Sequence, residues 1–583
     1  MVRVTAIPRK IKDYFSNSFR HQALENISAA RETEVEMEPK SPFQTSDREF
    51  GADWPQYRGV NRSHNDQKDM NRLGKKQEFK RNFRFLATLG FATIFSSTWE
   101  FVLVASGSGL INGGFGGLIW EYVWTFLGYS TIVVSLAEMS SMAPTAGGQY
   151  HWVSEFAPAR WQEYLSYAAG WTSTLAWQPA LAGGLYPIAV MIQTITQYNQ
   201  PGFFLLNWQA SLLMIALGFL TVPFNTVWRR ALPMFETIVL VFHFAGFFAT
   251  IIPLWILAPK NSATQVFTEI TNSGGWSNTG EAALEVSPDL GRVAYLMIAG
   301  LSLLVGQVSV SYCMAGADSA VHLSEEVEDA SLNVPRSMVW AFVLNGLMGF
   351  VMLITYVFCI GDLNSALDSP EPFVATFLNG TGSSGGATGL TIILFILLVA
   401  GNNTCTTTES RQMWAFARDK GLPFSGWLSK IHPRCNVPLN CIIVTIVINI
   451  IFCLINLGST LAFNIIIGLQ NVGFLSTSII SIGCLISARL RRDPLPQARW
   501  SLGRLGMPIN CFAVLYASFL VTFCFFPVMM PVTAQTVNWT PAIFVGVVVL
   551  ATSFYLVNGR KVYTAPVTYV EGKRRNGMLQ SVT

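Results

Sequence analysis

The chain has 583 residues, of which 51% are hydrophobic and only 12% are charged, and its formal net charge is +4. A soluble globular protein carries about 25% charged residues, so this composition excludes an ordinary soluble domain. The charge is also unevenly spread, because 17 of the 38 Lys and Arg residues fall within residues 1–84, and the small net charge gives no reason to expect a nucleic-acid partner.

Polar tails flank a long apolar region. Residues 1–80 have few apolar runs and are predicted to form a disordered cytoplasmic tail. They contain no apolar run long enough for the core of a cleavable signal peptide, so we expect the first membrane span to act as the targeting signal. Residues 81–558 alternate long apolar runs with short polar breaks, and residues 559–583 form a second cytoplasmic tail.

The apolar runs are long enough to cross a bilayer, which takes about 20 residues. We therefore predict an all-α polytopic membrane protein with twelve transmembrane helices. The expected spans lie near residues 83–110, 117–141, 163–196, 206–224, 233–258, 293–316, 336–360, 387–409, 438–457, 461–487, 508–530 and 540–557.

Basic residues predict the orientation of these spans. Of the 16 Lys and Arg residues between positions 110 and 558, 14 lie on the side of the tails, and only Lys260 and Arg292 lie opposite. Cytoplasmic loops carry the excess of Lys and Arg in membrane proteins, so both termini are expected in the cytoplasm. The N-glycosylation sequons at Asn379 and Asn538 then face outward, the second one close to the membrane surface.

The first expected span is interrupted by a short run in which polar residues prevail, which predicts a broken helix. The run consists of Ser96, Ser97, Thr98, Trp99 and Glu100. An acid inside a bilayer costs about 2.5 kcal/mol or more, so it needs a partner or a polar cavity. Glu100 is therefore a candidate for binding a solute, or alternatively a structural acid that bonds to exposed backbone groups.

Two further spans carry candidate residues. Trp177 in the third span precedes Gln178 and can face a cavity, although an interfacial Trp is the commoner case. Glu236 and His243 in the fifth span are seven residues apart and so lie on one helical face. A His within a span can relay protons, or it can be a neutral ring that bonds to a neighbouring helix.

Small residues interrupt the sixth expected span. Tyr312 is followed by Ala315 and Gly316, and Asp318 comes directly after them. Unwound backbone is tolerated in a bilayer only where it lines a cavity, and secondary transporters form solute sites at such broken helices. The alternative is a helix that ends early, with Asp318 as an N-cap in cytosolic water.

The eighth expected span ends in hydroxyl and amide side chains, residues 402–408, which can line a cavity or only join helices. The stretch 410–423 after it is amphipathic and is predicted to lie along the inner membrane surface. No metalloprotease motif, phosphate loop, zinc spacing or nucleophile elbow is present. We therefore predict no enzymatic activity, no cofactor and no metal site.

Three motifs carry a resemblance to a known family. They are Glu138–Tyr150, the run from Trp414 to Pro423, and the Gly316-Ala317-Asp318 interruption with Glu325 and Glu326. Together they resemble the amino acid/polyamine/organocation permease superfamily over residues 80–560, and most closely the fungal amino acid/choline/GABA permeases. The resemblance implies a LeuT-type fold with a 5+5 inverted repeat, in which helices 1 and 6 are broken.

The resemblance also implies where a solute and a proton bind. It places the solute between the two interruptions and implies that His243, with Glu236, stands where related proton-driven permeases carry a Lys in the fifth helix. The first interruption departs from the Gly-x-Gly of many amino acid permeases, and Trp177-Gln178 is more similar to the choline-like branch. The implied solute-binding residues are Ser96, Ser97, Thr98, Trp99, Glu100, Trp177, Tyr312, Ala315, Gly316 and Asp318.

The expected function is that of a proton symporter in the plasma membrane, which takes up choline, an amino acid or a related small amine. Its expected partners are this solute, protons and the lipid bilayer. Two alternatives stay open: a GABA or polyamine permease of an internal, vacuolar membrane, and a nutrient sensor of the same fold that does not transport.

Overall fold

The computed structural model describes residues 64–567, except residues 201, 204, 277–287, 370, 458–461, 534–535 and 564 and the side chains of residues 288–299 and 462. Most of the expected N-terminal tail and most of the C-terminal tail lie outside the described residues. Within the described part, the chain is helical, and its β-structure is one isolated bridge between Phe83 and Val327.

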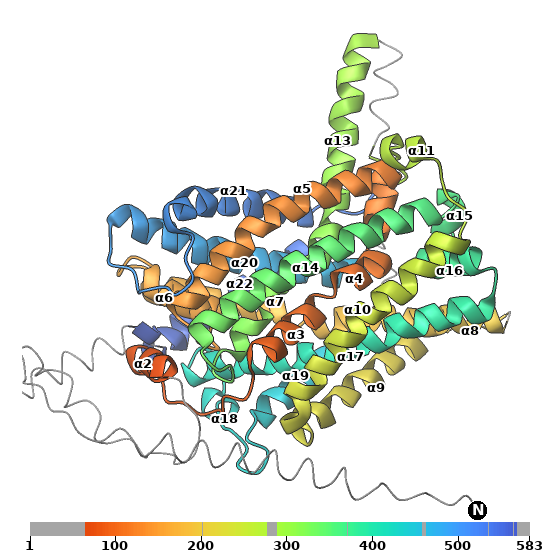
Figure 1. Ribbon diagram of the computed structural model, residues 1–583. Helices are drawn as coiled ribbons and strands as arrows, with labels where there is room; N and C mark the ends of the chain where they lie inside the picture. Colours follow the sequence, from red (N-terminus) through yellow and green to blue (C-terminus); the bar gives the residue numbers. More distant parts are fainter. Residues whose placement is uncertain are drawn as a thin grey trace, which may run out of the picture. The chain divides into compact units, whose positions relative to one another are not determined.

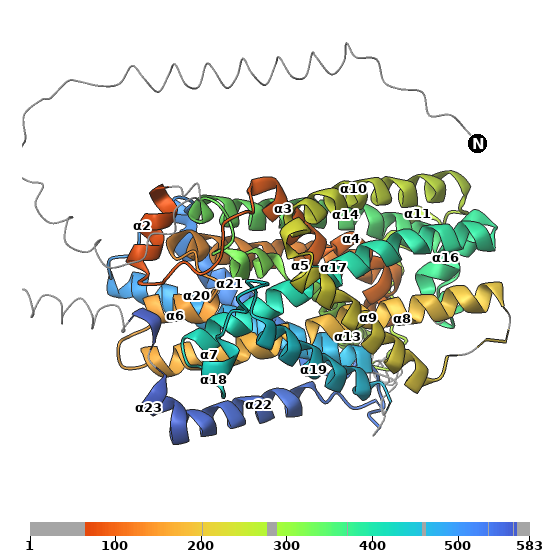
Figure 2. The same ribbon diagram turned by 90° about the horizontal axis from the view of Figure 1, so that it is seen from below.

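The long helices run side by side in a bundle (Figures 1 and 2). The main helices are α3 (Phe85–Ser96), α4 (Thr98–Ala105), α5 (Gly107–Met142), α6 (Gln149–Phe156), α7 (Gln162–Trp177), α8 (Ala180–Asn199), α9 (Asn207–Thr226), α10 (Leu232–Leu257), α13 (Pro288–Cys313), α14 (Ala330–Cys359), α17 (Ser384–Arg418), α19 (Leu439–Ile455), α20 (Ala462–Arg491), α21 (Gly506–Cys524) and α22 (Thr540–Phe554). Shorter elements are α2 (His64–Arg72), α11 (Ala263–Thr268), η2 (Ala317–Leu323), α15 (Leu363–Leu367), α16 (Pro372–Thr381), α18 (Ser425–Leu428) and α23 (Arg560–Val562).

Among the described residues, ten helical segments are long and apolar enough to cross a membrane. Two more helices, α5 and α19, run in the same bundle at the positions of the second and ninth expected spans (Figures 1 and 2). The predicted all-α membrane architecture is confirmed, while the number of twelve spans stays a prediction.

The outer surface of the bundle is apolar. Several large apolar side chains are more than half exposed, among them Phe219 on α9, Val241 on α10, Leu515 on α21 and Val549 on α22. An exposed apolar surface of this extent is stable where hydrocarbon, not water, surrounds it. These helices are therefore the ones that face lipid.

The first span is broken at Ser97, as the polar run predicted. α3 ends at Ser96, and Ser97 adopts a left-handed conformation with φ 37° and ψ 44°. α4 then begins at Thr98, and α3 and α4 lie end to end between α14 and α10 (Figure 1).

The sixth span is broken as well, and its interruption packs against the first. α13 ends at Cys313, and Gly316 has φ 92°, a conformation that favours glycine. A Cβ atom on Gly316 would lie 2.0 Å from a ring atom of Phe95, next to the break in the first span. Only glycine fits this contact, which holds the two interruptions together.

The stretch 410–423 does not lie along the membrane surface, so that expectation was wrong. α17 continues to Arg418, and its last turns are buried. Arg418 forms two hydrogen bonds with Glu325, of 2.7 and 2.9 Å, and Arg411 donates to Glu326 at 3.0 Å. These ion pairs neutralise the charges of Arg411 and Arg418, which had made residues 410–423 resemble an amphipathic surface segment.

The two sequons that are expected to face outward differ in their surroundings. The side chain of Asn379 is exposed on α16, whereas Nδ2 of Asn538 donates to the carbonyls of Cys524 and Phe526, both at 2.9 Å. We expect a glycan on Asn379 alone, because the Asn538 amide is already engaged. Asn379→Gln should abolish the gel-mobility shift caused by glycosidase treatment. Asn538→Gln should leave the shift intact, and its loss in that variant would contradict the expectation.

Candidate functional site

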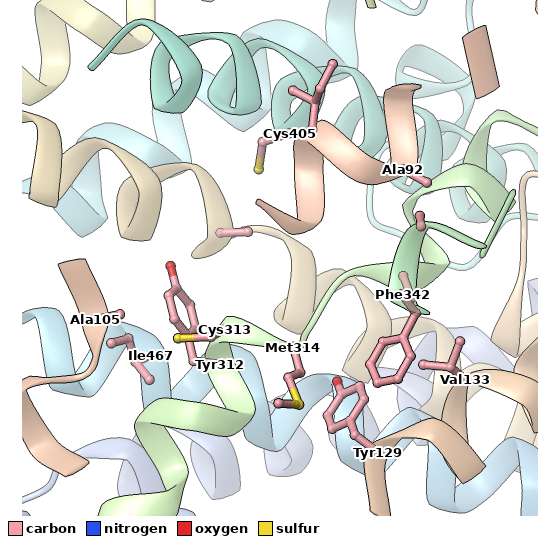
Figure 3. Close-up of a cluster of buried hydrophobic side chains, with 14 of the residues drawn as sticks. Ala92, Ala105, Tyr129, Val133, Tyr312, Cys313, Met314, Phe342, Cys405 and Ile467 are labelled. Carbon is pink, nitrogen blue, oxygen red and sulfur yellow. The ribbon is translucent and has the colours of Figure 1, made fainter. Parts of the chain in front are cut away.

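A cavity lies where the two interrupted helices meet, and its empty space, including the part open to solvent, is about 420 Å³. Its lining comes from α3, α4, α8, α13, α17 and α20. The lining residues are Phe95, Ser96, Ser97, Phe101, Ala180, Gly184, Tyr312, Ala315, Leu398, Gly401, Asn402, Cys405 and Gln470. Figure 3 shows Tyr312 and Cys405 facing the same space from opposite helices.

None of the thirteen lining residues carries a charge. Polar groups come from hydroxyl and amide side chains, and the buried atoms Ser96 Oγ and Gln470 Oε1 have no hydrogen-bond partner in the described structure. Buried polar atoms are nearly always hydrogen-bonded, so these two are available to a ligand. Three aromatic rings, those of Phe95, Phe101 and Tyr312, supply the apolar part of the wall.

The interruptions add backbone groups to the cavity. A helix that ends within the membrane leaves carbonyl groups without intrahelical partners, and a helix that begins there leaves N–H groups. The helix dipole makes the C-terminal end of a helix attractive to cations and the N-terminal end attractive to anions. Ser96 and Ser97 at the first break, and Ala315 at the second, place such ends in the wall.

Four of the ten predicted solute-binding residues line the cavity: Ser96, Ser97, Tyr312 and Ala315. Thr98 instead faces α14, where its N–H contacts Asn345 Oδ1 at 3.4 Å. Gly316 lies behind the Phe95 ring.

Trp177 supports the cavity from behind. Its buried ring lies 5.0 Å from that of Phe95, 4.9 Å from that of Phe474 and 5.2 Å from that of His322, measured between centroids. Trp177 is therefore in contact with a lining residue, Phe95, without being one itself. It marks the end of α7, where the third span is also interrupted before α8.

Asp318 lies away from the cavity, on η2. Its Oδ2 accepts a hydrogen bond of 2.5 Å from Gln149 Nε2, and the residue is only 5% exposed. His322, on the same element, contacts the Ala146 carbonyl at 2.9 Å. Asp318 is thus not in cytosolic water, and it joins η2 to the Pro-Gly-rich segment after α5.

Trp99, Glu100 and His243 form a separate buried cluster. Glu100 Oε1 lies 2.7 Å from His243 Nδ1, and Trp99 Nε1 lies 3.2 Å from the same nitrogen. An indole N–H only donates, so this ring nitrogen cannot accept from Trp99 and donate to Glu100 at once. The position of one proton therefore decides which of the two contacts is a hydrogen bond.

Glu236 and His243 contact different helices. Glu236 Oε1 accepts a hydrogen bond of 2.9 Å from Thr404 Oγ1 on α17, while His243 faces α4. Both acids, Glu236 and Glu100, keep one buried oxygen without a partner in the described structure.

Several lining residues were not predicted. Phe101, Gly184 and Gln470 stand alone in apolar surroundings, whereas Asn402 and Cys405 belong to the polar run at the end of the eighth span. Glu409 at the end of this run accepts from the Leu181 N–H at 3.0 Å and so caps α8 at the third interruption. A polar residue or polar run inside an apolar segment was the available signal for Asn402, Cys405 and Gln470, and the apolar lining residues carried no such signal.

Ionic contacts join the ends of several helices around Asp419. Lys75 bonds to Asp419, and Tyr150 Oη donates to the other oxygen of Asp419 at 2.8 Å. Burial would raise the pKa of Asp419, but Lys75 and Arg418 outweigh burial and hold the pKa below its usual value. Asp419 therefore stays charged at neutral pH, and its contacts weaken only when the pH falls through this lowered pKa.

A bulky side chain in the cavity should block solute binding. Ala180→Leu places three more carbon atoms in the wall, and overpacking of about 1.4 kcal/mol corresponds to about a tenfold loss of affinity. We expect at least this loss in the uptake of the transported solute. Gly389→Leu, on a part of α17 where a Cβ meets open space, is the matched control and should transport normally. Equal uptake by both variants at equal surface expression would place the solute elsewhere.

Comparison with known proteins shows which chains are similar to this one. The amino acid permease family model matches residues 84–549. A Macrophomina phaseolina protein named as an amino acid/polyamine transporter is 29% identical over 461 residues, which cover 78% of this chain and 97% of that protein. An amino-acid permease of Arabidopsis thaliana is 26% identical, covering 85% of this chain and 95% of that protein. The solved structure of a manganese transporter from Eremococcus coleocola aligns with a TM-score of 0.47 at 14% identity, over 81% of this chain and 94% of that one.

Proposed function

The chain belongs to the amino acid permease family, and on that premise we propose that it is a proton symporter for a small zwitterionic amino acid. Family membership makes it a multi-pass membrane transporter of the amino acid permease type and agrees with the predicted LeuT-type fold. We propose three further points: the identity of the solute, the proton as the coupling ion, and the plasma membrane as the location.

The observation that carries the proposal is the uncharged cavity at the two broken helices. A zwitterion brings its own opposite charges, so its ammonium group can bind carbonyl oxygens at one helix end and its carboxylate N–H groups at the other. A polyamine would bring several positive charges into a cavity that has no acidic side chain among its lining residues, which is costly without a partner.

Choline is the second candidate, favoured by the aromatic rings of Phe95, Phe101 and Tyr312 in the cavity wall. A quaternary ammonium group over such rings gains about 2 kcal/mol when it is desolvated. Glu100, the acid that we expected beside the cation, faces His243 and is not a lining residue. Without this acid, the cavity suits a neutral zwitterion better than a cation.

An uptake panel tests the solute. In cells that lack their own permeases, we expect uptake of a small neutral amino acid, with little competition from excess choline, GABA or spermidine. Choline uptake at a lower Michaelis constant than any amino acid would overturn the zwitterion. Binding without uptake of any of these solutes would favour a sensor, and a fluorescent fusion distinguishes the plasma membrane from the vacuolar membrane.

Proton coupling is assigned to His243 with Glu100. Both side chains are fully buried, they lie on α10 and on the half-helix α4, and a single proton decides how the cluster is bonded. An imidazole ordinarily changes its charge between about pH 5 and pH 8, the range between an acidic exterior and the cytoplasm. Glu236, bonded to Thr404, is proposed to assist by joining α10 to α17.

His243→Gln keeps a hydrogen-bonding side chain but cannot take up a proton. We expect this variant to lose solute-driven proton influx and to show a smaller rise of uptake with external acidity, measured from about pH 5 to about pH 8. Phe242→Leu, on the lipid-facing side of the same helix, is the matched control and should keep both. If His243→Gln retains the wild-type pH profile and still moves protons with the solute, another group couples transport.

A further inference from the structure

Glu121 is a buried acid that the cavity and the Glu100–His243 pair do not explain. It lies on α5, its exposed fraction is 0%, and neither carboxyl oxygen has a hydrogen-bond partner in the described structure. The described part of the chain forms no ion pair with it. An ionised carboxylate without any partner is among the most costly groups to bury.

The carboxyl group sits in a cradle of three glycines. A Cβ on Gly306 of α13 would lie 2.6 Å from Glu121 Oε1, one on Gly113 would lie 2.8 Å from the same oxygen, and one on Gly109 would lie 3.0 Å from Oε2. Any larger residue at these positions would collide with the acid. The helices therefore approach so closely that the carboxyl touches backbone on both sides, and the nearby Gly109 N–H already donates to Ser309 Oγ.

A second cavity, of about 500 Å³, adjoins this cradle towards the outer ends of α5 and α13. Ser108, Val305, Val308 and Ser309 are among its lining residues. A Cβ placed on Gly109 would lie 3.0 Å from Glu121 Oε2 and 3.3 Å from Ser309 Oγ, so both oxygens lie beside this glycine. Ser108 Oγ, also in this wall, is buried without a partner. Ser309 thus belongs both to the wall of this cavity and to the surroundings of the acid.

We propose that Glu121 is a proton-binding site in the outer half of the bundle, separate from His243, and that it must be neutral before α5 and α13 can close against each other. Closure over an ionised Glu121 would bury an unpaired charge between glycines. A proton from the outer cavity removes this charge, so external acidity favours the closed outer half.

Few other titratable groups face Glu121. On α5 the adjacent residue is Tyr122, whose Oη donates to the Gly346 carbonyl on α14 at 2.7 Å, and the tyrosine that α21 packs against α5 is Tyr516, beside Gly128. The packed face of α13 presents Gly306, Leu303 and Ser309, none of which titrates in this range. Neither Tyr supplies a positive charge, so no neighbour compensates an ionised carboxylate here.

Infrared spectroscopy of the purified full-length protein tests the charge state directly. Glu121→Gln should remove a carbonyl band of a protonated carboxyl that is present in the wild-type protein at neutral pH, and this result does not depend on transport. A difference spectrum that instead loses a carboxylate band overturns the proposal. Where Glu121→Gln does not fold, Glu121→Asp serves instead: a shift of the protonated-carboxyl band supports the proposal, and an unshifted band overturns it.

Uptake tests the consequence for closure and rests on the proposed transport function. Glu121→Gln is permanently neutral, so its uptake should fall less than that of the wild type when the external pH rises from about 5 to about 8. Glu121→Asp still titrates and should keep the wild-type fall. Identical pH profiles for Glu121→Gln and the wild type overturn the role in closure. Absence of uptake in every variant, with the infrared band intact, would contradict the proposed transport and leave the proton site standing.

Discussion

The contact between Phe95 and Gly316 is the constraint on which the site depends. It brings together the two points where α3 and α13 end, so residues of both interruptions line one cavity. The left-handed conformations of Ser97 and Gly316 end the helices at these points. A side chain at position 316 would separate the breaks, and each would then expose unpaired backbone groups to an apolar surrounding, which is costly.

Charged groups are kept behind the cavity wall. Glu100 and His243 pair on the far side of α4, Glu236 bonds to Thr404, and Asp318 bonds to Gln149. The charged side chains of Lys75, Glu325, Arg418 and Asp419 instead pair with one another near the end of α17. This separation lets the cavity bind a solute of zero net charge, while proton binding at a distance can alter how the helices around the cavity pack.

Local sequence patterns predicted some of these features and not others. The seven-residue spacing of Glu236 and His243 correctly places them on one face, but two turns amount to about 10 Å along the helix, so they meet different neighbours. Residues 410–423 looked amphipathic because their partners, Glu325 and Glu326, lie elsewhere in the chain. The acid Glu121 stood in an expected span, yet its importance depends on glycines of two segments, one of them nearly 200 positions away.

The sequence by itself determined that this is a helical membrane protein with interruptions in its first and sixth spans, because apolar length, glycine and polar residues act within a few turns of a helix. It also placed Ser96, Ser97, Tyr312 and Ala315 at the candidate site. Only the tertiary structure decided which acids face the cavity and which are paired behind it. Such pairing joins residues far apart, as in Glu100 and His243, which are separated by 143 positions, and no local pattern records which helices will pack together.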